Sequence, residues 1–226
     1  MNIIEKAVSE KKTTLSEYES KQVLSAYQIP ITREFLVYDE KNLISAANKI
    51  GYPLVLKGCD AKIAHKTEKN LIRTNVINEK DAITAFNDIQ TLMTGSNAAV
   101  IVQEMIIGKR ELVAGLIRDH QFGPCIMFGI GGIFTEIFND VTFRIAPINR
   151  QDALEMMDEI RGKRILEAVR GMEAADREQL SNLLVRIGQI GVENEMIQEI
   201  DINPIIISKG RAVAVDAMIV LNSLKK

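Results

Sequence analysis

The sequence predicts a mixed α/β protein built from two lobes. Helical and strand-like patterns alternate through the first hundred residues, whereas turn-separated strand segments dominate from Ala98 onward. A chain of 226 residues with 46% apolar and 26% charged residues can form one large or two smaller cores. No internal repeat or Pro/Gly-rich linker separates the halves, so we expect two lobes that share a cleft.

The first half is expected to alternate helices with strands. Ser16 and Glu19 have the spacing of a capping box, which predicts an amphipathic helix running toward residue 30. Apolar residues at helical spacing predict a second helix that begins at Asp39 and stops at Gly51. A third helix is expected through residues 82–89, and the strands expected around these helices are 34–37, 54–57 and 72–77.

The second half is expected to form a larger sheet with two helices. Its strand segments are 99–103, 112–117, 124–128 and 142–148, and its helices are 151–161 and 176–190. A hairpin of residues 199–203 and 212–216 closes the chain. We place the lobe boundary near Gln103, with a smaller lobe of residues 21–102 and a larger lobe of residues 103–226 together with 1–20.

Composition narrows the classes of partner. The net charge is −2 and both signs are mixed along the chain, so nucleic acid is not an expected partner. No apolar run approaches the roughly 20 residues of a membrane span, so no membrane association is expected. Cys59 and Cys125 lie in apolar segments without metal-ligand spacing, which favours reduced thiols and a cytoplasmic protein.

The closing hairpin suggests a metal site. If the turn falls at Lys209-Gly210, Asn203 lies directly opposite Asp216. A carboxylate and an amide oxygen at that spacing can hold one hard divalent cation such as Mg²⁺. Two alternatives stay open at this point: a surface hairpin with scattered polar residues, and a bulge at Pro204 that shifts the register.

Two residues could handle phosphate. Lys57 ends an apolar strand and suits a phosphate as a point charge, although a lysine at a strand end is common. His65 lies in the polar loop that follows, where an imidazole is free to act as a nucleophile or base. Taken alone, a histidine such as His65 is more often a solvated loop residue, which is our interpretation of His120.

Two further segments could bind a nucleotide. The run from Gly129 to Gly132 offers backbone N–H groups to an anion, with Arg144 further along to neutralise charge, but such runs are more often tight turns. The segment from Gln103 to Ile106 follows a buried strand, so its backbone could bind an adenine edge while Met105 covers the ring. Glu111 could then accept hydrogen bonds from ribose hydroxyls, unless it is merely solvated.

Five motifs in order resemble one family. They are Gly51–Lys57, Ile63–Glu68, Phe122–Glu136, Asp140–Pro147, and Asp201–Pro204 with Val215–Ala217. Together they resemble the ATP-grasp fold, and within it the nucleotide-binding β subunit of ADP-forming acyl-CoA synthetases of the acetate–CoA ligase type. The resemblance covers residues 15–221 and implies a fold of two lobes around a nucleotide cleft.

The resemblance implies a role for each candidate residue. Enzymes of this family interconvert acyl-CoA, ADP and phosphate with free acid, CoA and ATP, and a phosphoryl group travels on histidine. His65 matches a histidine proposed in the family as a phosphoryl carrier, with Arg144 offsetting charge. The implied cofactors are ATP or ADP and Mg²⁺, the ion being held by Asn203 and Asp216 with Asp201 nearby. The implied nucleotide contacts are Lys57 to phosphates, Gln103, Glu104, Met105 and Ile106 to adenine, Glu111 to ribose, and Gly131 and Gly132 in the anion loop.

The resemblance also implies a partner. CoA and the acyl substrate would be bound mainly by a separate CoA-binding α subunit, in an expected α2β2 heterotetramer. Two other functions remain open from the sequence: a non-catalytic nucleotide-sensing module, and a freestanding carboxylate–amine ligase, which would not explain His65.

The chain departs from the family pattern at two places. After the histidine motif, Lys69-Asn70-Leu71 stands where the family has a hydrophobic residue and two glycines. Asn70 tolerates left-handed backbone angles better than Leu71 does, so only the first position is an easy substitute. Ala168 replaces a second family glycine. Either change could signal reduced activity or altered partner contacts.

Overall fold

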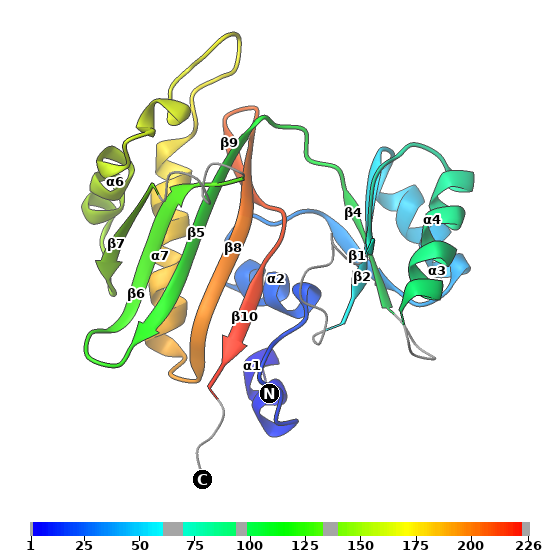
Figure 1. Cartoon of the computed structure of the whole chain (residues 1–226), viewed down its shortest axis with the longest axis horizontal. Coiled ribbons are helices and arrows are strands. Elements are labelled where there is room, and N and C mark those ends of the chain that lie inside the picture. Colours follow the sequence, from blue (N-terminus) through cyan, green and yellow to red (C-terminus); the bar gives the residue numbers. More distant parts are fainter. Residues whose placement is uncertain (1, 61–69, 94–98, 133–139, 223–226) are drawn as a thin grey trace. The chain divides into compact units, whose positions relative to one another are not determined.

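The computed structural model describes residues 2–60, 70–93, 99–132 and 140–222. The chain forms two compact units, and each contains its own antiparallel sheet (Figure 1). The smaller unit comprises Ser16–Tyr18 and Thr32–Met105, and the larger comprises Met1–Leu15, Glu19–Ile31 and Ile106–Lys226. The expected α/β class is confirmed. Within the described ranges, no helix has the length and apolar character needed to cross a membrane.

The smaller unit is a four-stranded sheet with two helices. The strand order is β1 (Glu34–Val37), β4 (Ala99–Glu104), β2 (Leu54–Cys59) and β3 (Ile72–Val76). The helices α3 (Glu40–Ile50) and α4 (Glu79–Leu92) pack their apolar residues against Leu54, Leu56, Val100 and Val102 of one sheet face. The residues that alternate with these four along their strands therefore point to the opposite face of the sheet.

The larger unit is built on a longer sheet. Its strand order is β10 (Met218–Leu221), β8 (Ile197–Ser208), β5 (Arg110–Asp119), β6 (Gly123–Ile130) and β7 (Val141–Ile145), and β9 (Arg211–Ala214) also pairs with β8. The helices are α1 (Ile3–Ser9), α2 (Glu17–Ala26), α6 (Arg150–Glu159) and α7 (Arg177–Glu193), with the 3₁₀ turn η1 (Lys163–Leu166). The first two residues of α2 belong to the smaller unit, and the rest of the helix belongs to the larger one. Helices α6 and α7 pack on one face of this sheet and form its main core (Figure 1).

Strand register decides which residues share each face of the larger sheet. Ile200, Leu116, Ile126 and Arg144 lie in one cross-strand row, on the face that carries the core. The next row holds Asp201, Gly115, Met127 and Phe143, which therefore point to the opposite face. This alternation separates candidate residues that lie close together in the sequence.

Several expected elements are confirmed and others were missed. Helix α3 begins after Asp39, whose side chain accepts the Asn42 N–H, and ends at Gly51 with φ of +87°. The sequence interpretation missed α1 and β10, which are short. Residues 19–31 pack with the larger unit, because Val23, Leu24 and Ile29 belong to its core, so the smaller unit resumes at Thr32.

Candidate functional site

The closing hairpin has the expected turn. Lys209 and Gly210 adopt φ of +49° and +75°, the left-handed angles that a two-residue hairpin turn requires. From Ser208 opposite Arg211, the pairing runs without a slip to Ile205 opposite Ala214. The predicted register of β8 and β9 is therefore confirmed over this stretch.

The same register continues past the end of β9. The Val215 N–H donates to the Pro204 carbonyl at 3.0 Å, and β10 rejoins β8 with Met218 opposite Asp201. Asn203 and Asp216 fall between these two ladders, opposite each other. The pairing on which the metal prediction depends is thus kept on this side of β8.

The bulge considered at Pro204 occurs on the other side of the strand. Against β5, Leu112 pairs with Ile205 but Ala114 pairs with Ile202, so β8 holds one extra residue at Asn203-Pro204. Ile202 and Ile205 both keep their buried positions. The bulge therefore alters the backbone at Asn203 without slipping the hairpin.

Carboxylates gather on this part of β8. The pKa of Asp201 is raised to about 6, first by burial and then by the neighbouring charges of Glu199 and Asp216. A bound cation would favour the charged form of Asp201, because it would offset the like charges around it. The oxygens of Asn203, Asp216 and Asp201 suit a hard cation, and Mg²⁺ typically takes one or two carboxylates plus water and phosphate oxygens.

The hairpin offers few side chains that could bind a metal ion. No group of three or more His, Cys, Asp or Glu residues in the described part of the chain forms a metal-binding cluster. An amide oxygen from Asn203 and a carboxylate from Asp216 would be an incomplete shell for a structural metal. They fit an ion whose remaining ligands come from solvent and from a bound phosphate.

Gly131 and Gly132 lie against Glu111. The Gly131 N–H donates to the Glu111 carbonyl at 2.8 Å, and Gly132 has φ of +68°. A Cβ atom on Gly132 would lie 2.7 Å from Glu111 Oε2, closer than real contacts allow. The structure therefore brings the predicted anion-loop glycines and the predicted ribose contact together.

Helix α2 contributes buried polar residues that the sequence interpretation did not select. Lys21 is fully buried, and its Nζ donates to the Val215 carbonyl at 3.3 Å. Ser20 Oγ accepts the Ile219 N–H at 3.1 Å. Both contacts support the backbone on either side of Asp216 and Ala217. Their signal in the sequence is the helical spacing of Glu17, Lys21 and Leu24, which puts charged residues on the buried face of the helix.

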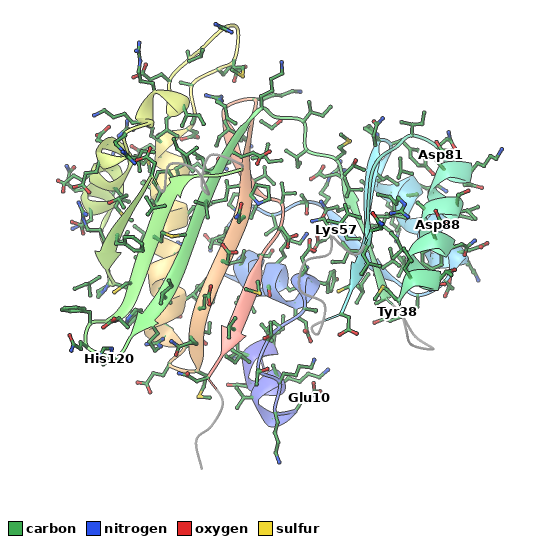
Figure 2. All side chains as sticks on the ribbon, in the orientation of Figure 1. Glu10, Tyr38, Lys57, Asp81, Asp88 and His120 are labelled. Atoms are coloured by element: carbon green, nitrogen blue, oxygen red, sulfur yellow. The ribbon has the colours of Figure 1, made fainter. Side chains whose placement is uncertain are left out.

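In the smaller unit, Lys57 does not end its strand and is not a lone cation. All six residues of β2 are buried, and Lys57 lies in the middle of that strand (Figure 2). Its Nζ is 2.7 Å from Glu17 Oε1, and the side chains are 5% and 1% exposed. The expectation of a cation at a strand end was wrong, because a long-range ion pair allows Lys57 to be buried.

The segment from Gln103 to Ile106 offers fewer free groups than expected. Gln103 is buried and lies between Glu34 and Val55, on the same face as Lys57. The side chain of Glu104 accepts hydrogen bonds from the Arg33 N–H and Nε, both at 2.8 Å.

The backbone of this segment is partly engaged as well. The Glu104 and Met105 N–H groups donate to the Arg33 and Pro53 carbonyls. Among the described residues, the N–H of Ile106 has no such partner, since Ile106 follows the end of β4. The Ile106 N–H is therefore the group of this segment that we expect to bind a ligand.

Arg144 is not brought together with the other candidates. It lies on the helix-covered face of the larger sheet, where its guanidinium forms an ion pair with Glu159 of α6. The hydrogen bond to Glu159 raises the pKa of Arg144. Asp201 points to the opposite face, so the described position of Arg144 does not support the predicted charge-offsetting role.

The loop that carries His65 lies outside the described residues, but its end is described. Asn70 has φ of +55°, whereas Leu71 does not adopt a left-handed angle and is 2% exposed. Only one family glycine therefore needs a residue that tolerates positive φ, and Asn70 meets that need. His120, as expected, is an exposed loop residue, with 84% of its side chain accessible.

Comparisons with known proteins identify the family. Residues 6–221 match the family model described as an ATP-grasp domain. The β subunit of acetate–CoA ligase [ADP-forming] I from Pyrococcus furiosus is 40% identical, with 97% of this chain and 96% of that protein aligned.

Two solved structures of acetyl-coenzyme A synthetase 1 from Ca. Korarchaeum cryptofilum agree. One, in complex with coenzyme A and Ca-AMPCP, superposes with a TM-score of 0.92 at 38% identity over 97% of this chain and 98% of that one. The other holds Mg-AMPPCP, with its phosphohistidine segment pointing towards the nucleotide-binding site, and gives a TM-score of 0.86 at the same identity and coverage. The chain belongs to the ATP-grasp family and, within it, to the β subunits of ADP-forming acetate–CoA ligases.

Proposed function

We propose that this chain is the nucleotide-handling subunit of an ADP-forming acyl-CoA synthetase. It binds ADP or ATP with Mg²⁺ and moves a phosphoryl group between the nucleotide and a phosphohistidine, which couples thioester chemistry to ATP. The observation that carries the proposal is the hairpin register that sets Asn203 opposite Asp216, beside Asp201. It occurs in a chain that aligns almost end to end with a relative holding a magnesium nucleotide.

The metal-binding residues are Asn203 and Asp216, with Asp201 close by. Bound Mg²⁺ supplies positive charge that neutralises nucleotide phosphates during transfer. The protein holds the donor oxygens of Asn203 and Asp216 in position. Lys21 supports this arrangement, because its Nζ donates a hydrogen bond to the carbonyl of Val215, the residue before Asp216. Because Asp201 is partly protonated near pH 6, metal affinity should rise as the pH increases through that value.

The base and the ribose are assigned to separate segments. In the stretch of Gln103, Glu104, Met105 and Ile106, the Ile106 N–H donates to the adenine edge, and Met105 covers the ring. The Glu111 carboxylate accepts from ribose hydroxyls. The missing Cβ atoms of Gly131 and Gly132 leave room beside the Leu112 backbone and the Glu111 carboxylate, so the backbone can approach the nucleotide closely.

Lys57 and Glu17 are proposed to act as a unit. Glu17 holds the Lys57 ammonium in place, and Lys57 presents its charge to the phosphates of the bound nucleotide. The Glu17 carboxylate offsets the cost of burying the Lys57 ammonium.

His65 is the proposed phosphoryl carrier. An imidazole nitrogen of His65 attacks the γ-phosphorus of ATP, an N–P bond forms, and the bond from phosphorus to the β–γ bridging oxygen breaks to release ADP. In the direction of ATP synthesis the same bonds form and break in reverse. We do not carry Arg144 into this step, because it is paired with Glu159 on the far sheet face.

The remaining chemistry belongs to a partner. A β subunit implies an α subunit, and we propose that it binds CoA and the acyl group in an α2β2 heterotetramer. A cytoplasmic location stays a prediction, drawn from composition and from two cysteines that form no disulfide.

Calorimetry of ADP binding with and without Mg²⁺ tests the metal assignment. Asp216→Asn should remove most of the gain in affinity that Mg²⁺ gives, roughly tenfold or more. Asp88→Asn, at an exposed carboxylate of α4, is the matched control and should bind like the unmodified protein (Figure 2). An undiminished Mg²⁺ effect in Asp216→Asn would rule out this hairpin as the metal site.

A further inference from the structure

A pocket in the larger unit is lined by several basic side chains. Its volume is about 480 Å³, within the range of small-molecule sites. Four basic residues line it, namely Lys109, Arg110, Arg170 and Lys209, against a single acid, Glu173. Three short segments far apart in the sequence supply these cations, so the charge is gathered by the fold.

This pocket is distinct from the candidate nucleotide site. Arg110 pairs with Ile207 across β5 and β8, and both side chains are buried on the face that carries the core. Glu111, the next residue, points to the other face, where its carboxylate lies beside Gly132. The alternation of the strand therefore directs Arg110 and the proposed ribose contact to opposite sides of the sheet.

Arg110 is a buried cation without a carboxylate partner. Its side chain donates only to backbone carbonyls, those of Ile165, Glu167 and Glu173, and the residue is 5% exposed. Its Nε has no hydrogen-bond partner in the described part of the chain, and no ion pair there involves Arg110. The guanidinium thus fixes the wall of the pocket and leaves its positive charge uncompensated, which favours an anion nearby.

Two tight turns place further basic residues at the pocket. In each turn the basic residue adopts a positive φ angle, which is unfavourable for residues other than glycine. Arg170-Gly171 connects the paired residues Val169 and Met172 with φ of +48° and +80°. Lys209-Gly210 repeats this geometry at the end of β8, with φ of +49° and +75°. Turns of this kind favour Asn or Asp at the first position, yet both carry a long basic residue there.

The exposed cations are also uncompensated. Lys109, Arg170 and Lys209 form no ion pair with any residue that the structure describes. Left-handed angles at non-glycine residues cost free energy and cluster at functional sites. Ile107 adds an apolar edge, with 73% of the residue exposed.

We propose that this pocket binds a small polyanion with two or more phosphate groups, either inorganic or esterified. Lys109, Arg170 and Lys209 contact the phosphates directly, and Arg110 holds the lining segment and adds its charge from behind. Ile107 would contact the organic part of an ester. This site is additional to the proposed nucleotide site and does not depend on it.

Calorimetry with inorganic tripolyphosphate, in EDTA, tests the proposal. The double variant Arg170→Asn with Lys209→Asn removes two charges while supplying the residue that these turns favour, so the thermal midpoint should be kept or raised. Affinity for tripolyphosphate should fall by roughly tenfold for each charge removed. Tripolyphosphate binding that is unchanged in the variant would overturn the proposal.

Matched variants separate this site from general charge and from the nucleotide site. Arg170→Lys with Lys209→Arg should retain binding, and Lys41→Gln with Lys80→Gln, which removes two exposed charges elsewhere, should do the same. Binding of ADP with Mg²⁺ should be unchanged in the double asparagine variant. A parallel fall in ADP affinity would overturn the proposal, because the pocket would then belong to the nucleotide site.

A second probe distinguishes the two sources of phosphate. Adenosine 3′,5′-bisphosphate carries esterified phosphates, and tighter binding than tripolyphosphate, reduced by Ile107→Ser, identifies an ester as the ligand. Tighter binding of tripolyphosphate identifies an inorganic polyphosphate. Failure of both probes would overturn the site.

Discussion

The two units differ in whether a buried charged residue has a partner of opposite charge. In the smaller unit, Lys57 is neutralised by Glu17 at 2.7 Å, so its charge is balanced within the protein. In the larger unit, burial and the charges of Glu199 and Asp216 raise the pKa of Asp201 to about 6. The lysine of the first region is paired with a carboxylate, whereas the second region gathers like charges that a bound cation would offset. The difference supports our proposal that the metal ion binds on the larger unit.

The largest expected effect concerns the buried ion pair. Glu17→Gln or Lys57→Met should each reduce the free energy of unfolding by about 3–5 kcal/mol, because each leaves one buried charge without its partner. The double variant should be far less destabilised than the sum of the singles. Urea unfolding of all four proteins measures this, and additive losses would contradict the view that the two residues act as a unit.

The second prediction concerns a substitution that should stabilise the protein instead of destabilising it. Asp201→Asn, measured in EDTA at pH 7 to 8, should raise the free energy of unfolding by about 2–3 kcal/mol. The pKa of Asp201 is higher in the folded state than in the unfolded state, so ionisation of this residue destabilises the fold. The loss of stability grows as the pH rises from about 4 to about 6 and stays constant above that range. Below about pH 4 the variant and the unmodified protein should agree. A variant that is less stable at pH 7 would show that Asp201 is favourably placed without metal.

A smaller effect is expected at the altered loop. Asn70→Gly should change the free energy of unfolding by less than about 1 kcal/mol, because asparagine already tolerates the φ of +55° found there. Thermal unfolding measures this difference. A large gain in stability would mean that Asn70 is strained, and that the departure from the family pattern weakens the loop.

The smallest effect is expected at Arg144. Arg144→Gln removes the ion pair with Glu159 but should leave the affinity for ADP with Mg²⁺ unchanged, because Arg144 lies on the helix-covered face. Calorimetry of ADP binding measures it. A marked loss of affinity would restore the charge-offsetting role that the sequence suggested.

Local patterns in the sequence predicted much of the fold and part of the site. The capping residue Asp39 and the stop at Gly51 are short-range signals, and the Lys209-Gly210 turn set the hairpin register because pairing is fixed by the turn. What the sequence could not give was long-range pairing. The partner of Lys57 is forty positions away.

The face occupied by Arg144 was equally hidden, for a related reason. A strand's side chains alternate between faces, so a shift of one residue in register moves Arg144 from one side of the sheet to the other. That register depends on β6, β5 and β8 together, and no local pattern at Arg144 specifies it.

The most direct test of the proposed function is phosphoryl transfer from γ-labelled ATP, with Mg²⁺ and the α subunit present. We expect label that is stable in alkali and labile in acid, lost from this chain in His65→Ala and kept in the matched variant His120→Ala. Asp216→Asn should slow the labelling. Tight ATP binding with no label on either subunit would contradict the account.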